Sequence, residues 1–503
     1  MVKGDQVEIK IEDLTAEGQG LGRSDGMAVF VKGAVPGDMV RAELTKVKKN
    51  YAFGRLTQII TPSEDRIENL CEQSGQCGGC PFDGLGYEAQ LKIKEKRVRD
   101  SLTRLGGLTD PLIQPIVGME TPFRYRNKAS MPVSTGGIIT RKGGLVENLG
   151  PAAIGFYKAK SHDVVNCYDC MLQSEPAMAA AEAVRQFMEE DNITGYDPKW
   201  EKGLMRHLVV RTAFGTGEVM VILVINGKGI PNVAKLVEML DDAIAELPPA
   251  YEDGPEYSLE SVVVNVNKGK SADIFGDECI TVAGKPTITE IAGGMKFEIS
   301  PLSFYQVNPE QMVNLYDKAA EYAGLTGGET ILDLYCGVGT IGLYLLGELR
   351  ERSEMADEGP DSGFDAARVI GIESIKSAVI DANRNAVINH IVNARYVFGR
   401  AEEELPKLLS GEGIADEGLK VDKVDVAVID PPRSGCDTRL LEALIDAKPE
   451  RIVYVSCDPA TLARDVKYLG ENGYEFEEAT PVDMFPWTGH VETVCLLSKK
   501  CKV

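Results

Sequence analysis

The residues best suited to chemistry lie between positions 451 and 465, in the stretch RIVYVSCDPATLARD. Ile452–Val455 is a short apolar, β-rich run, which predicts a buried strand. Asp458 can cap a helix that has Pro459 at its first position. Cys457 is therefore expected at a strand end, just before a helix N-terminus, where the reactive thiolate is favoured over the thiol. A buried structural cysteine is the alternative, because that is the usual role of an isolated cysteine.

Further reactive groups follow a second strand-like run, Val424–Asp430. It continues into Asp-Pro-Pro-Arg at residues 430–433, which places a carboxylate and two rigid prolines at a strand end. Ligands bind at the carboxyl ends of strands in α/β sheets, so this carboxylate is expected in the same cleft as Cys457. Cys436 is the rival thiol, but it lacks the helix N-terminus. Glu492 is a candidate base, with an exposed strand carboxylate as the alternative.

A glycine-rich loop, CGVGTIG at residues 336–342, follows the strand-like run Thr330–Tyr335. It formally matches the dinucleotide fingerprint G-x-G-x-x-G, so a nicotinamide-dependent oxidoreductase is one interpretation. Asp333 before the glycines, together with the Asp-Pro-Pro-Arg motif, favours S-adenosylmethionine instead. Glu373 ends the next strand-like run and can accept hydrogen bonds from ribose hydroxyls, as the acidic residue of dinucleotide folds does.

Cysteines form a separate group. Cys71, Cys77 and Cys80 fall within ten residues, around a flexible Gly-Gly pair, and can close on one metal centre. An iron–sulfur cluster or a zinc ion normally takes four thiolates. Cys167 and Cys170 are the candidates for the fourth, and spacing alone does not distinguish the cluster from zinc. Three cysteines that lie close by chance are the alternative.

Composition limits the class of protein. The chain has 503 residues, of which 44% are apolar and 26% charged, as in globular proteins with several domains. Its net charge of −23 argues against broad electrostatic attraction to nucleic acid or to an anionic membrane. Residues 91–128 nevertheless hold nine Lys and Arg against four Asp and Glu. Phe123–Lys128 interleaves cations with aromatics, which can grip phosphates and stack bases, or can form a solvated strand.

Targeting signals are absent from the sequence. The first residues offer no signal peptide, and no apolar run approaches the roughly 20 residues of a membrane helix. We therefore expect a cytoplasmic protein without membrane contact, whose eleven cysteines are thiols, metal ligands or catalysts rather than disulfides. No protein partner is implied.

The elements that carry these groups fall into three regions. Residues 1–62 alternate apolar and polar residues, with a turn expected at Gly18–Gly22, and predict a small closed β-barrel of OB type. Residues 63–300 predict an α+β domain that holds the cysteine cluster, with helices over Tyr87–Leu105 and near 174–190 and 230–246. Residues 301–503 alternate strands and helices, as in a doubly wound, Rossmann-like α/β sheet. The strands expected in the barrel are Val7–Ile11, Ala28–Val31, Asp38–Leu44 and Gly54–Ile60.

Specific motifs add a resemblance that covers nearly the whole chain. They are Ser303–Asn308, Asp333–Gly337, Asp430–Arg433, Ser456–Asp465 and His490–Val494, together with Tyr125–Lys128 and the cysteine cluster. With these motifs the chain resembles the class I S-adenosylmethionine-dependent RNA uracil-5-methyltransferases. Residues 16–23, 35–38 and 51–54 resemble a TRAM domain, an RNA-binding barrel. The form with this barrel is typical of the 23S rRNA enzymes, so the resemblance implies 23S rRNA as the favoured substrate and tRNA as the alternative.

The resemblance also implies residue roles. Cys457 is the implied nucleophile and Glu492 the implied base. The implied contacts to S-adenosylmethionine are Gln306, Tyr335, Glu373 and Asp430. The implied ligands of a [4Fe-4S] cluster are Cys71, Cys77, Cys80 and a fourth cysteine that falls on Cys170.

The expected reaction overcomes the poor nucleophilicity of uracil C5. A thiolate that adds to C6 makes an enolate with carbanion character at C5, which can attack the sulfonium methyl group. A base then removes the C5 proton and the thiolate is eliminated. A target base in folded RNA must first swing out of its stack. An adenine amino-methyltransferase, which usually carries Asn-Pro-Pro-aromatic and needs no thiol, and a non-catalytic RNA-binding protein are the remaining alternatives.

Overall fold

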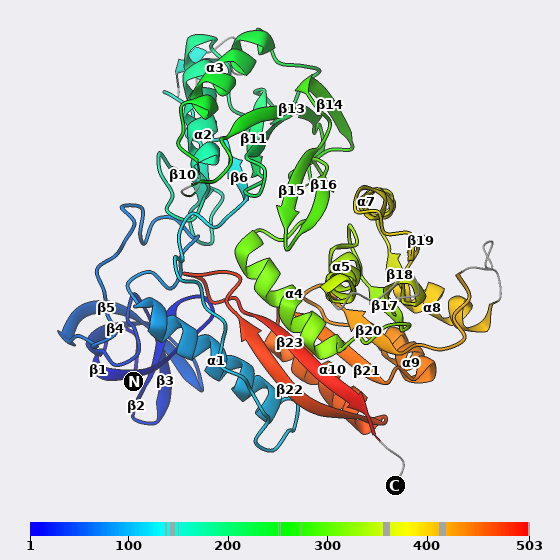
Figure 1. The fold of residues 1–503 in the computed structure, drawn as a ribbon. Coiled ribbons are helices and arrows are strands. Elements are labelled where there is room, and N and C mark those ends of the chain that lie inside the picture. Colours follow the sequence, from blue (N-terminus) through cyan, green and yellow to red (C-terminus); the bar gives the residue numbers. More distant parts are fainter. Residues whose placement is uncertain are drawn as a thin grey trace.

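The computed structural model of the protein describes residues 1–135, 138–140, 146–148, 150–249, 251, 253–271, 273–355, 363–411 and 419–500. Figure 1 shows an N-terminal barrel in blue, a central sheet with its helices in cyan to green, and a C-terminal sheet in yellow to red. Among the described residues, no helix combines the length and the apolar character needed to cross a membrane.

The N-terminal strands close into a five-stranded barrel in the order β1-β2-β3-β5-β4, with β1 also paired to β4. Its fully buried side chains, such as Ile9, Val29 and Val40, alternate with outward-facing residues, which confirms the predicted barrel. The turn predicted over Gly18–Gly22 is wrong, because most of these residues form β2. A Cβ at Gly22 would clash with the neighbouring strand, so glycine here permits close strand packing instead of a turn. The strands are β1 (Gln6–Leu14), β2 (Gln19–Ser24), β3 (Met27–Lys32), β4 (Met39–Val47) and β5 (Tyr51–Thr61).

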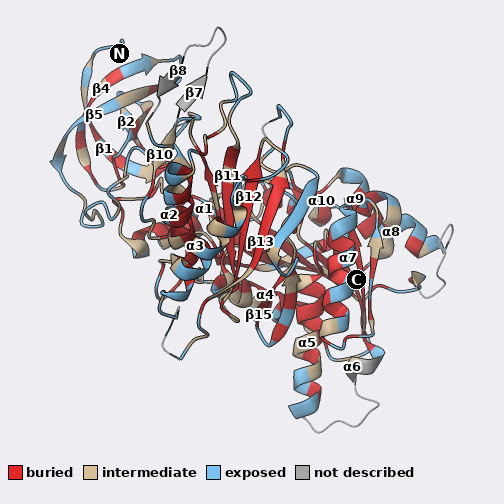
Figure 2. Ribbon diagram, turned by 90° about the horizontal axis from the view of Figure 1, so that it is seen from above, coloured by how far each residue is buried: buried red, intermediate tan, exposed pale blue. Residues whose placement is uncertain are grey.

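The central region is built on a sheet in the order β14-β13-β12-β11-β6. Its strands β11, β12 and β13 are buried along most of their length (Figure 2). Helices α2 (Glu175–Glu190) and α3 (Val233–Ala245) pack on each other and on this sheet, as expected for an α+β region. The strands are β6 (Lys128–Pro132), β11 (Met205–Thr212), β12 (Glu218–Ile225), β13 (Ser258–Val266) and β14 (Glu278–Gly284), with short pairs β7 (Ile138–Thr140) and β8 (Val146–Asn148), and β9 (Gly155–Tyr157) and β10 (Val164–Asn166).

The C-terminal sheet has seven strands in the order β19-β18-β17-β20-β21-β23-β22. The first five are parallel, whereas β23 runs antiparallel to both β21 and β22. The predicted doubly wound α/β fold is confirmed, but the sheet is not wholly parallel. The strands are β17 (Thr330–Leu334), β18 (Arg368–Glu373), β19 (Ala394–Phe398), β20 (Val426–Ile429), β21 (Arg451–Ser456), β22 (Tyr474–Val482) and β23 (Glu492–Lys499).

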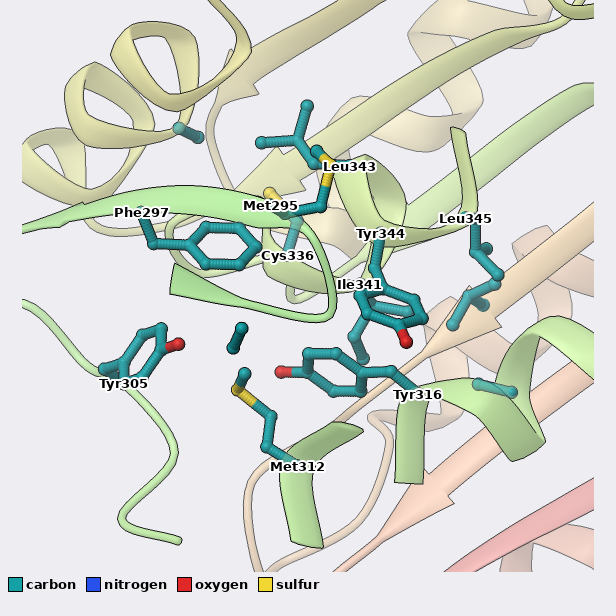
Figure 3. Close-up of a cluster of buried hydrophobic side chains, with 14 of the residues drawn as sticks. Met295, Phe297, Tyr305, Met312, Tyr316, Cys336, Ile341, Leu343, Tyr344 and Leu345 are labelled. Carbon is teal, nitrogen blue, oxygen red and sulfur yellow. The ribbon is translucent and has the colours of Figure 1, made fainter. Parts of the chain in front are cut away.

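Helices cover both faces of this sheet. One face packs against α4, α5 and α7 and against the hairpin β15–β16, and the other packs against α8, α9 and α10. Figure 3 shows the first core, where Tyr316 of α4 and Tyr344 of α5 lie beside Met295 and Phe297 of the hairpin. The elements are β15 (Ile288–Ala292), β16 (Met295–Ile299), α4 (Pro309–Ala323), α5 (Thr340–Met355), α6 (Gly363–Ala366), α7 (Lys376–Ile388), α8 (Ala401–Ser410), α9 (Thr438–Ala447) and α10 (Pro459–Glu471).

One segment that precedes the central sheet in sequence packs on the C-terminal sheet. Helix α1 (Tyr87–Arg104) lies against α10, and Val98 and Leu102 join the same core. Beyond it, Ile113 and Val117 bridge to Ala479 and Val482, along the edge strand β22. The division into residues 1–62, 63–300 and 301–503 stays a prediction, and this strip ties the second region closely to the third.

Candidate active site

Cys457 and Glu492 meet at one edge of the C-terminal sheet. Ser456 ends β21 and pairs with Thr493 of the antiparallel strand β23, so the residues next to this pair lie at the same edge. The carboxylate of Asp458 caps α10, because it accepts hydrogen bonds from the backbone N–H groups of Ala460 at 2.8 Å and Thr461 at 3.1 Å. The predicted strand, cap and helix around Cys457 are therefore all present.

Electrostatics at Cys457 differ from the expectation. Burial, followed by the negative charges of Glu492 and Asp430, raises the pKa of the Cys457 thiol to about 11, whereas Arg433 acts in the opposite direction. The helix N-terminus is present as predicted, but burial and the two carboxylates oppose the thiolate that it favours.

The two carboxylates beside this thiol are poised for proton transfer. Glu492 is only 4% exposed, so it is not the exposed strand carboxylate considered as its alternative. Burial, and then the charge of Asp430, raises the pKa of Glu492 to about 8, while Arg433 lowers it. Burial, and then the charge of Asp333, raises the pKa of Asp430 to about 7. A carboxyl group with a pKa near neutrality is suited to general acid–base work.

Cys436, the rival thiol, directly precedes Asp437, the N-cap of α9, so the prediction that it lacks a helix N-terminus is wrong. Its surroundings are what distinguish it from Cys457. It is buried, and its backbone N–H donates to Asp465 Oδ2 at 2.9 Å. The Tyr454 hydroxyl lies 3.7 Å from Cys436 Sγ and donates to Asp465 at 2.7 Å. Burial is the main reason that the pKa of Cys436 is raised to about 12. These contacts describe a packed structural cysteine.

A cavity of about 540 Å³ opens at the carboxyl ends of β17, β18 and β19. Tyr335 lines it and has φ +63°, a left-handed backbone conformation that is uncommon outside glycine and often marks a functional site. Glu373 lies between the lining residues Ile372 and Ser374, and Asp430 lies two residues before the lining residue Pro432. Gln306 is buried and does not line this cavity.

The carboxylates around the glycine loop are held by backbone groups. Glu373 accepts hydrogen bonds from Gly337 N at 3.1 Å and Ile375 N at 2.8 Å. Asp333 accepts one from Gly342 N at 3.0 Å, and burial raises its pKa to about 7. A Cβ at Gly342 would lie 2.7 Å from Asp333 Oδ2, so this position requires glycine.

The sequence interpretation missed Tyr316. This tyrosine on α4 is buried, and the charges of Asp430, Asp333 and Glu492 all contribute to the raised pKa of its hydroxyl. Its hydroxyl lies 2.9 Å from Thr340 Oγ1. The only sequence signal at this residue is the spacing of apolar residues along α4. That spacing predicts core packing and not a position near three carboxylates.

Five cysteines line a second cavity, of about 390 Å³. They are Cys71, Cys77, Cys80, Cys167 and Cys170. Backbone N–H groups of Gln73 and Gly79 donate to the sulfurs of Cys71 and Cys77, each at 3.4 Å. Within the described ranges, no group of three His, Cys, Asp or Glu side chains is placed to hold a single metal ion.

Cys167 and Cys170 differ in their surroundings. Cys167 is 5% exposed, and its thiol donates to the carbonyl of Asp169 at 3.2 Å. A hydrogen bond from Cys167 is the main reason that the pKa of Cys170 is lowered to about 6 while that of Cys167 is raised. In this arrangement Cys170 is the better thiolate of the two.

The cations expected to bind RNA are half buried around the cysteine cavity. Arg124 donates to the carbonyl of Cys170 at 2.8 Å and forms an ion pair with Asp169 at 2.8 Å, so it braces the cysteine segment. Lys128 lies over the ring of Phe275 at 5.7 Å, and burial lowers its pKa to about 8. Arg126 lines the cysteine cavity and lies over the ring of Phe485 at 5.9 Å.

Comparison with known proteins decides the family. The TRAM domain profile matches residues 2–57, and the tRNA (uracil-5-)-methyltransferase profile matches residues 287–500. An uncharacterized RNA methyltransferase of Halalkalibacterium halodurans is 41% identical over 498 residues, covering 99% of this chain and 98% of the relative. The chain belongs to the RNA uracil-5-methyltransferase family. A second RNA methyltransferase, from Caldanaerobacter subterraneus, is 41% identical to this methyltransferase over 497 residues, or 99% and 98% of the two chains.

A solved structure supports the same assignment. The Pyrococcus abyssi tRNA (uracil-54, C5)-methyltransferase, in complex with S-adenosyl-L-homocysteine, matches this methyltransferase with a TM-score of 0.70 and 29% identity. The match covers 98% of this chain and 100% of the other. The nicotinamide-dependent oxidoreductase considered from the glycine loop is therefore wrong, and the prediction of an RNA methyltransferase is confirmed.

Proposed function

We propose that this methyltransferase transfers a methyl group from S-adenosylmethionine to C5 of a uridine in RNA, with Cys457 as nucleophile and Glu492 as base. The observation that carries the proposal is the antiparallel pairing of β21 with β23, which brings a half-buried thiol and a buried carboxyl to one sheet edge beside Asp430. The carboxylate beside Cys436, that of Asp465, already accepts hydrogen bonds from Cys436 N at 2.9 Å and from the Tyr454 hydroxyl at 2.7 Å.

The proposed reaction passes through a covalent intermediate. The Cys457 thiol loses its proton to solvent, and the thiolate adds to C6 of the uracil, which makes an enolate with carbanion character at C5. A bond then forms between C5 and the methyl carbon as the sulfonium carbon–sulfur bond breaks and its electron pair stays on sulfur. The Glu492 carboxylate takes the C5 proton, the C5–C6 double bond returns, and the bond between C6 and Cys457 breaks. The released Cys457 thiolate takes up a proton from solvent and Glu492 gives its proton to solvent, so one proton is released overall.

For the methyl donor, we propose contacts from Gln306, Tyr335, Glu373 and Asp430. The 540 Å³ cavity beside Tyr335 has the size and position of a cofactor site in an open α/β sheet. Both oxygens of Glu373 are already oriented by backbone N–H groups, which suits an acceptor for two ribose hydroxyls. Gln306 lies outside this cavity and would contact the donor from the side of α4.

For the cysteines, we propose a [4Fe-4S] cluster held by Cys71, Cys77, Cys80 and Cys170. The support is a single cavity of about 390 Å³ that is lined by all four thiols. Such a cluster would supply four metal–sulfur bonds that cross-link residues 71–80 with Cys170. Zinc is the alternative, and metal analysis of protein purified without oxygen separates the two.

For the substrate, we propose 23S rRNA, as the resemblance implies, with the barrel of residues 1–62 as an RNA-binding domain. A tRNA substrate is the second candidate, and a specific observation favours it. The Pyrococcus abyssi enzyme, named for tRNA, aligns over 98% of this chain, so a barrel of this kind does not by itself select rRNA.

The test is to map 5-methyluridine in rRNA and tRNA from cells with and without this protein. The proposal expects one or more uridines of 23S rRNA to lose the C5 methyl group in cells without it. Loss confined to tRNA would replace rRNA by the second candidate, and no loss in either RNA would contradict the proposed function.

A further inference from the structure

The segment from Asp483 to Val491 joins β22 to β23 and ends directly before Glu492. It contains no helix or strand, yet all its residues except Phe485 and His490 are buried. Trp487, at its centre, is 4% exposed and has φ +67°. A large residue keeps such a strained conformation only where its surroundings hold it. The backbone that leads to the proposed base is therefore fixed from outside the segment.

Residues from distant parts of the chain hold successive positions of this segment. Lys94 of α1 forms a buried ion pair with Asp483 at 2.5 Å and donates to the carbonyl of Phe485 at 3.0 Å. Three further side chains donate hydrogen bonds to backbone carbonyls of this segment. Asn308 Nδ2 donates to Met484 at 3.1 Å and the Tyr125 hydroxyl donates to Pro486 at 3.0 Å. Arg97 Nη1 donates to Gly489 at 2.5 Å.

Trp487 connects this segment to the cysteines. Its indole N–H donates to the carbonyl of Pro122 at 2.8 Å, and its ring stacks on Phe123, with centroids 5.4 Å apart and planes 20° apart. Its carbonyl accepts a hydrogen bond from Phe82 N at 3.1 Å, two residues after Cys80. Trp487 also lines a small cavity with Cys71, Cys80 and Cys170.

We infer that Trp487 is a positioning residue for Glu492, and that through it the arrangement of the cysteine segment sets the position of the proposed base. This inference rests on the proposed function. Movement of residues 80–82 would pull on the Trp487 carbonyl, and the chain from Trp487 to Glu492 is short and buried. A displacement of about 1 Å is enough to slow a proton transfer strongly.

The kinetic test uses Trp487→Phe, which keeps an aromatic ring for the stack but removes the N–H that binds Pro122. The chemistry divides into methyl transfer, which needs Cys457, and release of the methylated RNA, which needs Glu492. We expect the release rate to fall about tenfold, because the variant loses one buried hydrogen bond. The rate of methyl transfer and the KM for RNA should stay within about twofold of the wild-type values. A covalent adduct between methylated RNA and protein should accumulate. If this variant is insoluble, Gln90→Met removes the acceptor of the Trp487 backbone N–H instead.

A second test reads the coupling without measuring activity. The chain has two tryptophans, and Trp200 is 44% exposed, so Trp200→Phe leaves Trp487 as the sole indole fluorophore. In that background, Cys80→Ser should shift Trp487 emission to longer wavelength and increase its quenching by acrylamide at least twofold. Cys279→Ser, on the exposed strand β14, is the matched control and should change neither.

The outcomes separate this inference from the proposed function. Glu492→Gln is included as the reference for a lost base. If it accumulates no adduct, the proposed function fails. If it does, but Trp487→Phe slows methyl transfer and release equally, the positioning role is wrong. Trp487 fluorescence that is unchanged by Cys80→Ser would overturn the coupling to the cysteines.

Discussion

At the scale of single residues, position in the chain predicts which groups lie close together but not the electrostatic surroundings that shift their pKa values. A local view of Cys457 includes only the helix N-terminus, which lowers a thiol pKa. The structure adds burial, Glu492 and Asp430, which together raise the pKa to about 11. The carboxylates come from other strands, so no local sequence pattern contains them. Among these neighbours, Arg433 is the one whose charge favours the thiolate.

Burial of Glu492 predicts a pH-dependent cost in stability. Its pKa rises from 4.5 in the unfolded chain to about 8 in the folded protein, so the folded state retains a proton that the unfolded chain loses. The cost of burying this group is absent below about pH 4.5, grows as the pH rises to 8, and is constant above. Glu492→Gln should therefore stabilise the protein at pH 9, by up to roughly 4 kcal/mol, and have little effect at pH 5. Urea unfolding at the two pH values measures this, and equal effects at both would contradict the buried, proton-retaining carboxyl.

At the scale of elements, strands with clear apolar runs were predicted well, and pairing direction was not. The bounds of β18 and the cap of α10 agree with the sequence patterns. Strand β2 was missed because its glycines, needed for close packing against β1, also signal turns. The antiparallel direction of β23 has no signature in its residues, although it is what brings Glu492 to Cys457. Such pairing depends on the whole sheet, beyond any local window.

The first turn of α5, which follows the glycine loop, gives an element-scale prediction. Gly342→Ala would place a methyl group 2.7 Å from Asp333 Oδ2 and 2.8 Å from Val369, next to the loop that we propose for the donor site. We expect a loss of about 1–3 kcal/mol in the free energy of unfolding and at least tenfold weaker binding of S-adenosylmethionine. Gly470→Ala on α10 is the control, because a Cβ there meets open space. It should stabilise the helix by about 0.5–1 kcal/mol and leave donor binding unchanged. Equal donor affinity in both variants would argue against this loop as the donor site.

At the scale of the whole molecule, residues from the second predicted region pack around the segment that leads to Glu492 in the third. The barrel could be predicted because apolar and polar residues alternate regularly in its strands. The packing of α1 and residues 113–117 on the C-terminal sheet could not be predicted, because these residues precede the central sheet in sequence. Two cations contact the segment that joins β22 to β23: Arg97 of α1 donates to the carbonyl of Gly489, and Arg126 lies over the ring of Phe485.

This arrangement predicts where RNA affinity resides in a chain of net charge −23. Arg126→Glu should weaken RNA binding and reduce the slope of log affinity against log salt by about one, the value for one lost phosphate contact. Arg104→Glu, at the exposed end of α1, is the control and should have a smaller effect. Affinity for S-adenosylmethionine should not change in either variant. If Arg126→Glu binds RNA as wild type does, the RNA surface lies elsewhere.

The central claim, that Cys457 forms the covalent bond and Glu492 resolves it, is tested most directly by denaturation-resistant RNA adducts. RNA with 5-fluorouridine at the target should trap the wild-type protein, because fluorine cannot leave as a proton does. Glu492→Gln should methylate ordinary RNA and then remain covalently attached to the methylated product. Cys457→Ala should form no adduct and no 5-methyluridine, whereas Cys436→Ala should do both. An adduct that persists in Cys457→Ala and disappears in Cys436→Ala would contradict the assignment of the nucleophile. Methylation unaffected by either change would contradict covalent catalysis itself.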